Sequence, residues 1–237
     1  AAAIQDYGRG VIIGSTSTYG KGTVQRNIGL DAKNGFTFGE SELGTLKLTL
    51  QKFYRINGGS TQLKGVESDI ILPSQIETLT LREKDNEDAL PYDELSKASF
   101  KKWPASFDLK TIQQESNVRL AQDSAFTIIK DNSAWLSRQN DKSYSLNIDD
   151  YRNEKKEIKE KVSQIEAVMK LKNKLNVSLL HNEQNKYADD KNKQERVKAW
   201  LKSLSEDIYL DQAVRVVDDM INMENVAKNS SSVITVN

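Results

Sequence analysis

The stretch VIIGSTSTYGKGTVQ, residues 11–25, decides how the first half of this chain folds. Its apolar run Val11–Gly14 predicts a short buried strand, and Gly22–Ile28, rich in β-branched side chains, predicts a second strand. Lys21 lies between them with a glycine on either side, and glycine adopts tight turns that other residues resist. We therefore expect a lysine held in a defined position on a turn between two strands.

The glycines and prolines divide the 237 residues into two parts. All 12 glycines lie between Gly8 and Gly65, and the three prolines follow at positions 73, 91 and 104. Frequent glycine predicts a turn-rich segment with strands, and its disappearance predicts long helices. The expected fold class is therefore an α/β part with turn-rich strands followed by an all-α helical C-terminal domain, with the boundary in the proline-bearing stretch.

Two more strands and a short helix complete the first part. Leu46–Leu50 alternates apolar with polar side chains and continues into Phe53–Ile56, and Asp69–Leu72 predicts one more short strand. Ala1–Tyr7 is typical of the end of an amphipathic helix, and no capping residue precedes it, so we expect that the chain begins inside a domain. Three or four strands with one helical stub predict a partial sheet with open edges, which needs a covering neighbour.

Four sets of apolar residues at helical spacing predict a helix bundle in the second part. These sets are Ile128, Ile129, Trp135 and Leu136; Ile158, Val162, Ile165 and Met169; Val197, Trp200, Leu201 and Leu204; and Leu210, Ala213, Val214, Val217 and Ile221. We expect each set to form a buried face, and Asp149 or Asp150 to cap the second helix. The polar run 182–196 predicts an exposed turn or frayed helix, and the Ser/Asn-rich tail 229–237 is expected to be mobile.

The composition excludes several kinds of function. Lys+Arg and Asp+Glu balance at 34 each, so no overall charge favours nucleic acid or an anionic membrane. There is no cysteine, which excludes disulfides, thiol catalysis and thiolate metal sites. His181 is the one histidine, so a histidine metal site and a Ser-His-Asp triad are excluded, and we expect it at the surface. No cofactor is expected.

Three interpretations of Lys21 compete. The simplest is a surface lysine in a β-turn. The second is a phosphate-binding loop, but five residues separate Gly14 from Gly20 where that loop has four, and Gly22 replaces the hydroxyl that binds magnesium. The segment after Gly22 is also strand-like, whereas phosphate binding needs a helix N-terminus there. The third interpretation is a general base that removes the proton of a serine nucleophile.

A lysine acts as a base only when it is neutral. Its pKa must then fall from about 10.4 to about 7–8, which costs roughly 3–4 kcal/mol of differential interaction. Burial beside apolar residues supplies such a shift, and Val11–Ile13 and Val24 are the nearest apolar residues in sequence. The Gln25 side chain, four residues on, is placed to accept a hydrogen bond from the amine. Ser15 and Ser17 are too close in sequence to serve as the nucleophile.

Two segments near the start of the chain resemble the C-terminal processing peptidases, the tail-specific serine proteases of bacterial envelopes. In that family the nucleophilic serine opens a helix, which continues through an alanine-rich segment into a Gln-Asp-Tyr-Gly-Arg-like sequence, a strand and the lysine motif. AAAIQDYGR (residues 1–9) followed by TYGKGTVQ (18–25) matches that order and spacing. The resemblance implies that Lys21 is the catalytic base, that Gln25 orients it, and that the serine and the oxyanion-hole amides lie upstream of Ala1.

Further segments are similar to the same family. QKFYRINGGSTQ (51–62) is similar to the strand and turn after the lysine, and GVESDI (65–70) differs from the family's element in having Ser68 where proline is usual. EDALPYD (87–93) is similar to the junction that leads into the helical C-terminal domain of the larger branch. The resemblance is strong over residues 1–95 and architectural beyond. It implies a C-terminal part of a Ser/Lys protease domain at 1–80, a linker at 81–107 and a helical C-terminal domain at 108–237.

The family resemblance also implies a cellular role. It implies an endopeptidase of the bacterial periplasm or envelope that acts on proteins or peptides with free C-termini, with a lipoprotein adaptor as a further partner. The chain by itself is expected to be inactive because it holds the base without the nucleophile. The alternative is a non-catalytic interaction module, either a pseudoprotease or an adaptor-binding helical domain, whose partial sheet pairs with an added strand. A serine at the head of the first helix distinguishes the protease from this alternative.

Overall fold

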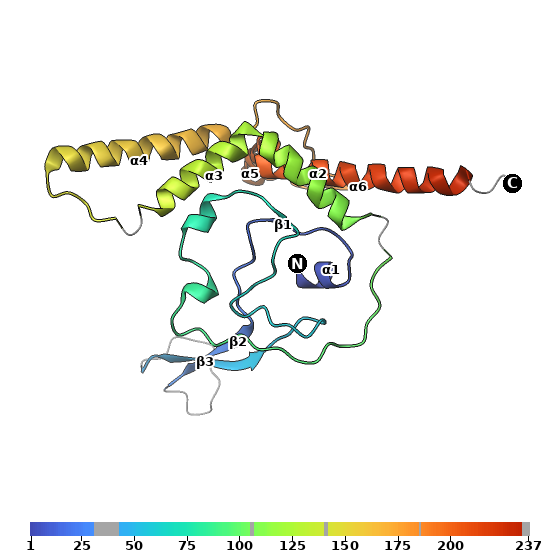
Figure 1. Ribbon diagram of the computed structural model, residues 1–237, viewed down its shortest axis with the longest axis horizontal. Helices are drawn as coiled ribbons and strands as arrows, with labels where there is room; N and C mark the ends of the chain where they lie inside the picture. Colours follow the sequence, from blue (N-terminus) through green and yellow to red (C-terminus); the bar gives the residue numbers. More distant parts are fainter. Residues whose placement is uncertain (31–42, 105–106, 140–141, 185, 234–237) are drawn as a thin grey trace. The chain divides into compact units, whose positions relative to one another are not determined.

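The computed structural model describes residues 1–30, 43–104, 107–139, 142–184 and 186–233, with side chains described as far as Glu224. The chain forms two compact units, which are described separately. Unit 1 comprises Ala1–Ile12, Thr16–Asp69 and Thr80–Ala105, and unit 2 comprises Ile13–Ser15, Ile70–Leu79 and Ser106–Asn237. The predicted fold class, short strands followed by a helical region, is confirmed (Figure 1). The predicted domain limits at residues 80 and 107 stay a prediction.

Unit 1 is built on an antiparallel strand pair, β2 (Thr23–Gly29) and β3 (Thr45–Lys52), with α1 (Ala2–Asp6) and a 3-10 turn, η2 (Glu83–Asp85). The register places Gln25 opposite Thr49, and a bulge interrupts the pairing just before Gln25. The strand expected at Gly22–Ile28 and the N-terminal helix are thus confirmed.

The third predicted strand is shorter than expected, since β3 ends at Lys52 and does not continue through Ile56. The pairing extends by one further bond, from the Phe53 amide to the Gly22 carbonyl (3.0 Å), and beyond it the Arg55 side chain pairs with Asp6. A tight turn follows, because Gly58 has a φ of +95°, a conformation that residues with a Cβ atom rarely adopt.

The described buried side chains of unit 1 are mostly polar. They are Asp6, Thr23, Ser60, Thr61, Gln62 and Glu83, together with the apolar Val66. Arg55 Nη2 lies 2.6 Å from Asp6 Oδ1 with both side chains largely buried, and Asn57 Nδ2 donates to the same oxygen (3.0 Å). The Arg55 guanidinium also donates to Gln5 Oε1 (2.8 Å). This unit is therefore held together chiefly by hydrogen bonds that join α1 to the turn after β3.

The segment from residue 80 to residue 104 is part of unit 1 and has little regular structure beyond η2 (Figure 1). Backbone hydrogen bonds fix it at four points along its length. Glu83 donates to Tyr19 (3.0 Å), Leu95 to Gly58 (2.8 Å), Ala98 to Ile56 (3.0 Å) and Trp103 to Tyr7 (2.7 Å). The segment that we expected to be a linker is therefore fixed by hydrogen bonds to the rest of unit 1.

Unit 2 begins with a parallel strand pair, β1 (Ile13–Gly14) and β4 (Ile70–Ile71), followed by the 3-10 turn η1 (Gln75–Thr78). The predicted strands therefore form two separate two-stranded sheets and not one partial sheet. The helices of unit 2 are α2 (Leu109–Gln122), α3 (Ser124–Ser137), α4 (Ile148–Val168), α5 (Lys191–Ser205) and α6 (Ile208–Val233), with the 3-10 turn η3 (His181–Glu183) before α5.

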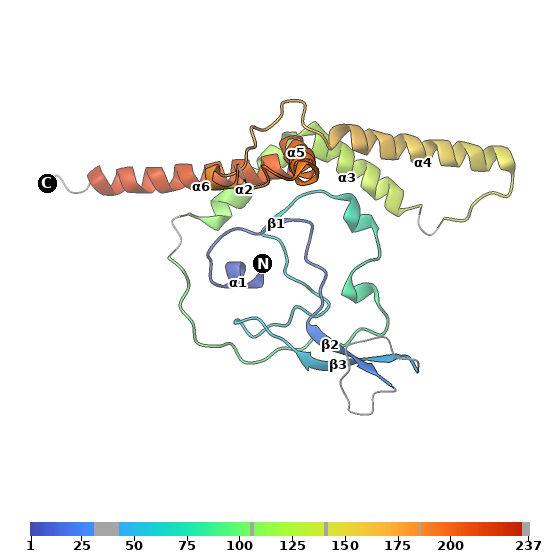
Figure 2. The ribbon, with the colours of Figure 1, turned by 180° about the vertical axis from the view of Figure 1, so that it is seen from behind.

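An apolar core joins four of these helices to β4. Its buried members are Ile70, Leu72, Ile112, Phe126, Ile129, Ile165, Ile208 and Val216. The Phe126 and Tyr209 rings meet edge to face with their centroids 5.8 Å apart, and the Tyr209 hydroxyl donates to the Pro73 carbonyl (2.9 Å). Viewed from behind, α5 lies beside the start of α6 (Figure 2), and an isolated bridge joins Lys170 to Asp207 at this end of the unit.

The helix predictions are confirmed for α3 and α4 and need correction elsewhere. The α4 cap is Asn147, whose side chain accepts from the Asp149 and Asp150 amides, so neither aspartate is the cap. Helix α2 was not predicted, because its apolar residues are too sparse to show a period. Helix α5 begins at Lys191, inside the run that we expected to be a turn or frayed helix. Asn229–Val233 of the expected mobile tail lie in α6, and 234–237 lie outside the described residues.

The predicted buried face of α6 is wrong. Ile208, Gln212 and Val216 are buried, whereas Val214, Val217 and Ile221 are about half exposed. The buried face has its own apolar residues, Ile208 and Val216, and Arg119 of α2 donates to Gln212 (3.4 Å) and Asp219 (2.8 Å), so α6 packs through this face and not through the predicted stripe. In α5, all of whose residues are described, no side chain is fully buried, and Trp200 is 54% exposed. No helix in the described residues is long and apolar enough to span a bilayer.

The buried pair of Asp6 and Arg55 is expected to dominate the stability of unit 1. Arg55→Ala leaves the Asp6 carboxylate buried without its cation, which should lower the free energy of unfolding by about 3–5 kcal/mol. Arg152→Ala, which breaks an exposed pair with Asp149, should cost less than about 1 kcal/mol. Urea unfolding of both variants measures the two costs. Equal losses would show that the buried pair is not what holds α1 in place.

Candidate active site

The loop that carries Lys21 is fixed on both sides of the lysine. Gly20 has a φ of +97°, and its carbonyl accepts from the Leu63 amide (2.7 Å). The Gly22 amide donates to Gln62 Oε1 (2.8 Å), and Thr61 Oγ1 donates to the Lys21 carbonyl (2.9 Å). Only the Lys21 side chain is left to move, which fits the expectation of a lysine in a defined position.

Lack of space for a side chain requires a glycine at position 22. A Cβ atom there would lie 2.6 Å from Ser60 Oγ, 2.7 Å from Gln62 N and 2.9 Å from Gln62 Cβ. Real Cβ contacts are longer than these, so the backbone of residues 60–62 packs directly against the lysine loop. The two segments form one rigid support for Lys21.

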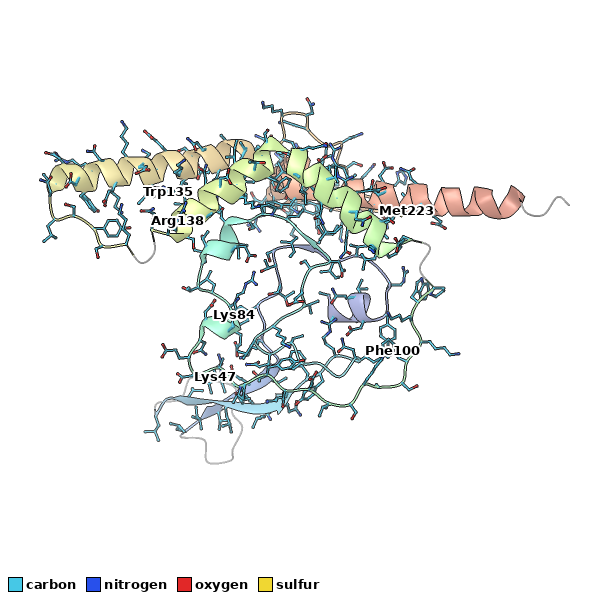
Figure 3. All side chains as sticks on the ribbon, in the orientation of Figure 1. Lys47, Lys84, Phe100, Trp135, Arg138 and Met223 are labelled. Carbon is cyan, nitrogen blue, oxygen red and sulfur yellow. The ribbon has the colours of Figure 1, made fainter. Side chains whose placement is uncertain are left out.

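Lys21 and Gln25 line the same polar cleft of about 270 Å³. Its other lining residues are Tyr19, Thr23, Lys47, Thr49, Glu83, Asn86, Asp88, Ala89 and Leu90. Figure 3 shows Lys47 on β3 and Lys84 in η2, the two elements that contribute Lys47 and Glu83 to the lining. The sequence-based pair of site residues is therefore brought into one cleft, and the role of each stays a prediction.

The ion-pair partner found for Lys21 is Glu83. Lys21 Nζ lies 3.9 Å from Glu83 Oε1, with the Lys21 side chain 37% exposed and the Glu83 side chain 8% exposed. Gln62 Nε2 donates to the same carboxylate oxygen (3.1 Å) and to the Leu90 carbonyl (2.9 Å). A single buried glutamine thus connects the lysine loop to the segment that carries Glu83 and Leu90.

The expected apolar surroundings of Lys21 are wrong. Val24 is 45% exposed and does not line the cleft, whereas its neighbours Thr23 and Gln25 do. The lining of the cleft is mostly polar and charged. The Lys21 amine therefore faces mainly charged and hydrogen-bonding groups in this cleft.

Gln25 and the nearby serines have other partners. Gln25 Nε2 donates to Thr49 Oγ1 (3.2 Å), which fixes the amide across the strand pair. Ser17 Oγ accepts from Arg82 Nη1 (2.7 Å), in agreement with its exclusion as the nucleophile. Ser60 packs against Gly22 but is 4% exposed, and its Oγ accepts from the Gln62 amide (3.0 Å), so a substrate cannot reach it.

A second charged cluster fastens the end of β3 to residues 92–93. Lys52 Nζ and the Tyr54 hydroxyl both donate to Asp93 Oδ2, each at 3.0 Å. The hydrogen bond from Lys52, together with that from Tyr54, lowers the pKa of Asp93 below its ordinary value. Burial and the nearby Asp93 carboxylate raise the pKa of Tyr54. Both shifts stabilise a charged Asp93 and a neutral Tyr54 at neutral pH.

Sequence reasoning missed Glu83 and Gln62 as site residues. Gln62 lies at the end of one of the segments used for the family resemblance, but nothing in the sequence distinguishes it from a surface glutamine. Glu83 lies among exposed charged residues. Within the described residues no group of three His, Asp or Glu could hold a metal ion, and His181 is exposed in η3 as predicted.

Two known protein families match parts of this chain. Residues 76–222, more than half of the chain, match the family described as C-terminal domain of tail specific protease (DUF3340). The chain belongs to the tail-specific protease family. Residues 1–72, which include Lys21 and Gln25, match Peptidase family S41.

A curated relative gives the scale of the similarity. The tail-specific protease of Haemophilus influenzae is 49% identical over 100 residues, which are 42% of this chain and 14% of the length of that protein. The resemblance inferred from the lysine motif is therefore confirmed at the level of the family. The match covers a minor part of the relative's length, so we propose, and do not infer from this match, an activity for the whole protein.

The close packing at Gly22 generates a prediction about stability. Gly22→Ala should lower the free energy of unfolding by about 1–3 kcal/mol, because the new methyl group meets backbone that cannot move away easily. Gly10→Ala is a matched control, since its added Cβ would meet only the tip of Ile4 at 3.2 Å. Thermal and urea unfolding of the two variants should separate them. A Gly22→Ala variant as stable as Gly10→Ala would contradict the packing described here.

The Asp93 cluster generates a prediction about pH. Since the pKa of Asp93 is lowered in the folded state, its contribution to stability is present above the ordinary value of 3.8 and is lost as the pH falls through the folded-state value. The native chain should therefore be more stable than Asp93→Asn near neutral pH, and the difference should shrink on acidification. Urea unfolding at a series of pH values measures it. A difference that stays constant down to strongly acidic pH would show that the carboxylate charge is not the stabilising feature.

Proposed function

We propose that this chain is part of a serine endopeptidase in which Lys21 is the general base of a Ser/Lys dyad. The observation that carries the proposal is the fixed Gly20-Lys21-Gly22 loop, which presents Lys21 in the same cleft as Gln25 within the part that matches Peptidase family S41. The serine of the dyad is proposed to belong to a part of the protein upstream of Ala1. The chain alone is then inactive.

The proposed reaction follows from these positions. A neutral Lys21 amine takes the proton of the serine hydroxyl as its oxygen attacks the peptide carbonyl, and the protonated amine returns the proton to the leaving amine. A water molecule then attacks the acyl-enzyme, with Lys21 again accepting and returning one proton. Gln25, fixed through Thr49, is proposed to orient the amine within the cleft.

The proposal extends to partners and location. As in the family that the sequence resembles, the substrates are proposed to be proteins or peptides recognised through free C-termini, and the compartment is proposed to be the bacterial periplasm or envelope. The domain division at residues 80 and 107 is proposed on the same basis. The helical region is proposed to dock a lipoprotein adaptor.

A second candidate function is a non-catalytic interaction module. The observation that favours it is the exposure of large apolar side chains on α5 and α6, where Trp200, Val214, Val217 and Ile221 are all about half exposed. Such side chains are typical of surfaces that bind other proteins. A protein that binds peptides but cleaves none would favour this candidate.

The experiment that tests the protease uses a longer form of the protein that includes the residues upstream of Ala1. Lys21→Ala should reduce kcat for an unstructured peptide with an apolar C-terminus by about 10²–10⁴-fold, because the serine loses its proton acceptor. Gln25→Ala should reduce kcat by a smaller factor. Lys84→Ala removes an exposed lysine that lies outside the cleft lining and serves as the matched control. Equal turnover by Lys21→Ala and Lys84→Ala would overturn the assignment.

A further inference from the structure

Glu83 is a buried carboxylate whose surroundings depend on Lys21. Its side chain is 8% exposed, and its Oε1 atom faces Gln62 Nε2 at 3.1 Å and Lys21 Nζ at 3.9 Å. Burying a carboxylate is costly unless it is paired or accepts hydrogen bonds. The Lys21 ammonium therefore stabilises Glu83 where it lies, and by the same interaction Glu83 restrains the direction of the amine.

The segment that carries Glu83 is attached to the lysine loop at two further points. The Glu83 amide donates to the Tyr19 carbonyl (3.0 Å), and Arg82 Nη1 donates to Ser17 Oγ (2.7 Å). Within the turn, the Arg82 amide donates to Asp85 Oδ2 (2.8 Å). The carboxylate is therefore held in place relative to Lys21 by contacts of Glu83 itself and of Arg82, the residue before it.

Other titratable groups share the cleft with this pair. Lys47 of β3 adds a positive charge, Asp88 adds a negative charge, and Tyr19 adds a phenol. Among the described lining residues, Glu83 is the carboxylate within ion-pair distance of Lys21. Because Glu83 is buried, solvent and salt screen this interaction less than they screen an exposed pair. Glu83 is thus the neighbouring charge with the strongest expected effect on the amine.

We propose that Glu83 is a positioning residue that holds the Lys21 amine in the cleft. Glu83 lies in the part that matches the tail-specific protease C-terminal domain, whereas Lys21 lies in the part that matches Peptidase family S41. The C-terminal region therefore supplies a residue to the site of the lysine. The catalytic meaning of this contact rests on the proposed function, in which Lys21 must release a proton before it can act as a base.

The test measures the reactivity of Lys21 in this chain, without any need for turnover. Acetic anhydride acetylates lysine amines, and an amine held in an ion pair reacts more slowly than a free one, so the rate of acetylation, read by mass spectrometry, reports how firmly each lysine is held. At mildly alkaline pH, Lys21 in Glu83→Gln should be acetylated about two- to fivefold faster than in the native chain, because the paired carboxylate is gone. Glu87→Gln, the same change at an exposed position outside the cleft lining, should leave the rate unchanged.

Lys52 provides an internal control for folding. It is paired with Asp93 in the same unit, so its acetylation rate should stay at the native value in Glu83→Gln if the unit remains folded. If the acetylation rate of Lys52 rises as well, Glu83→Asp is compared with the native chain instead. This variant keeps the charge but places it one methylene farther from Lys21, so Lys21 should be acetylated at an intermediate rate. A Lys21 rate that is native in Glu83→Gln, with Lys52 also native, would overturn the proposal.

The same variant has a second expected effect in the longer protease form. Glu83→Gln should lower kcat, and Glu83→Asp, which keeps the carboxylate, should restore part of it, whereas a purely structural role of this buried side chain would leave both variants equally impaired. The two proposals fail in distinguishable ways. An inactive native protease with faster acetylation in Glu83→Gln would overturn the dyad alone, and an active protease with unchanged acetylation would overturn the role of Glu83 alone.

Discussion

The arrangement of the site depends on one buried amide, that of Gln62, which is 0% exposed. Its carbonyl oxygen fixes the Gly22 amide, and its nitrogen holds both the Glu83 carboxylate and the Leu90 carbonyl. Three segments distant in sequence therefore meet at a single side chain. A buried amide costs free energy unless its donors and acceptor are all satisfied, and here each polar atom has a protein partner. That requirement fixes the lysine loop and the segment beside it as one structure.

This constraint matters because the described interior of unit 1 contains little apolar surface. Hydrogen bonds and ion pairs have strict distances and directions, whereas apolar contacts tolerate small shifts. A unit held by polar groups is therefore well suited to placing one amine accurately. Removal of one hydrogen-bonding partner, however, leaves the other buried and unsatisfied, which lowers the stability of the unit substantially. Unit 2 has the opposite character, with an apolar core shared by α2, α3, α4 and α6.

The sequence predicts local features well and long-range polar contacts poorly. The lysine turn, the strand after it and the helices α3 and α4 follow from glycine spacing and apolar periods, which act over a few residues. The contacts of Lys21 with Glu83 and of Gly22 with Gln62 do not, since residues separated by 62 and 40 positions show no local pattern. The prediction for α6 was wrong for a similar reason, because a partner of its buried side, Arg119, lies 100 positions away in the sequence from Asp219.

The order of the two units along the chain has a practical consequence. Residues 13–15 and 70–79 belong to unit 2, although unit 1 supplies the residues on both sides of each segment. The backbone therefore changes unit five times, at residues 12/13, 15/16, 69/70, 79/80 and 105/106. No single cut releases either unit whole, and a truncation designed on the order of the domains removes strands or turns from both. Unfolding of one unit must then strain the ends of the other, so the two are expected to lose structure together under proteolysis.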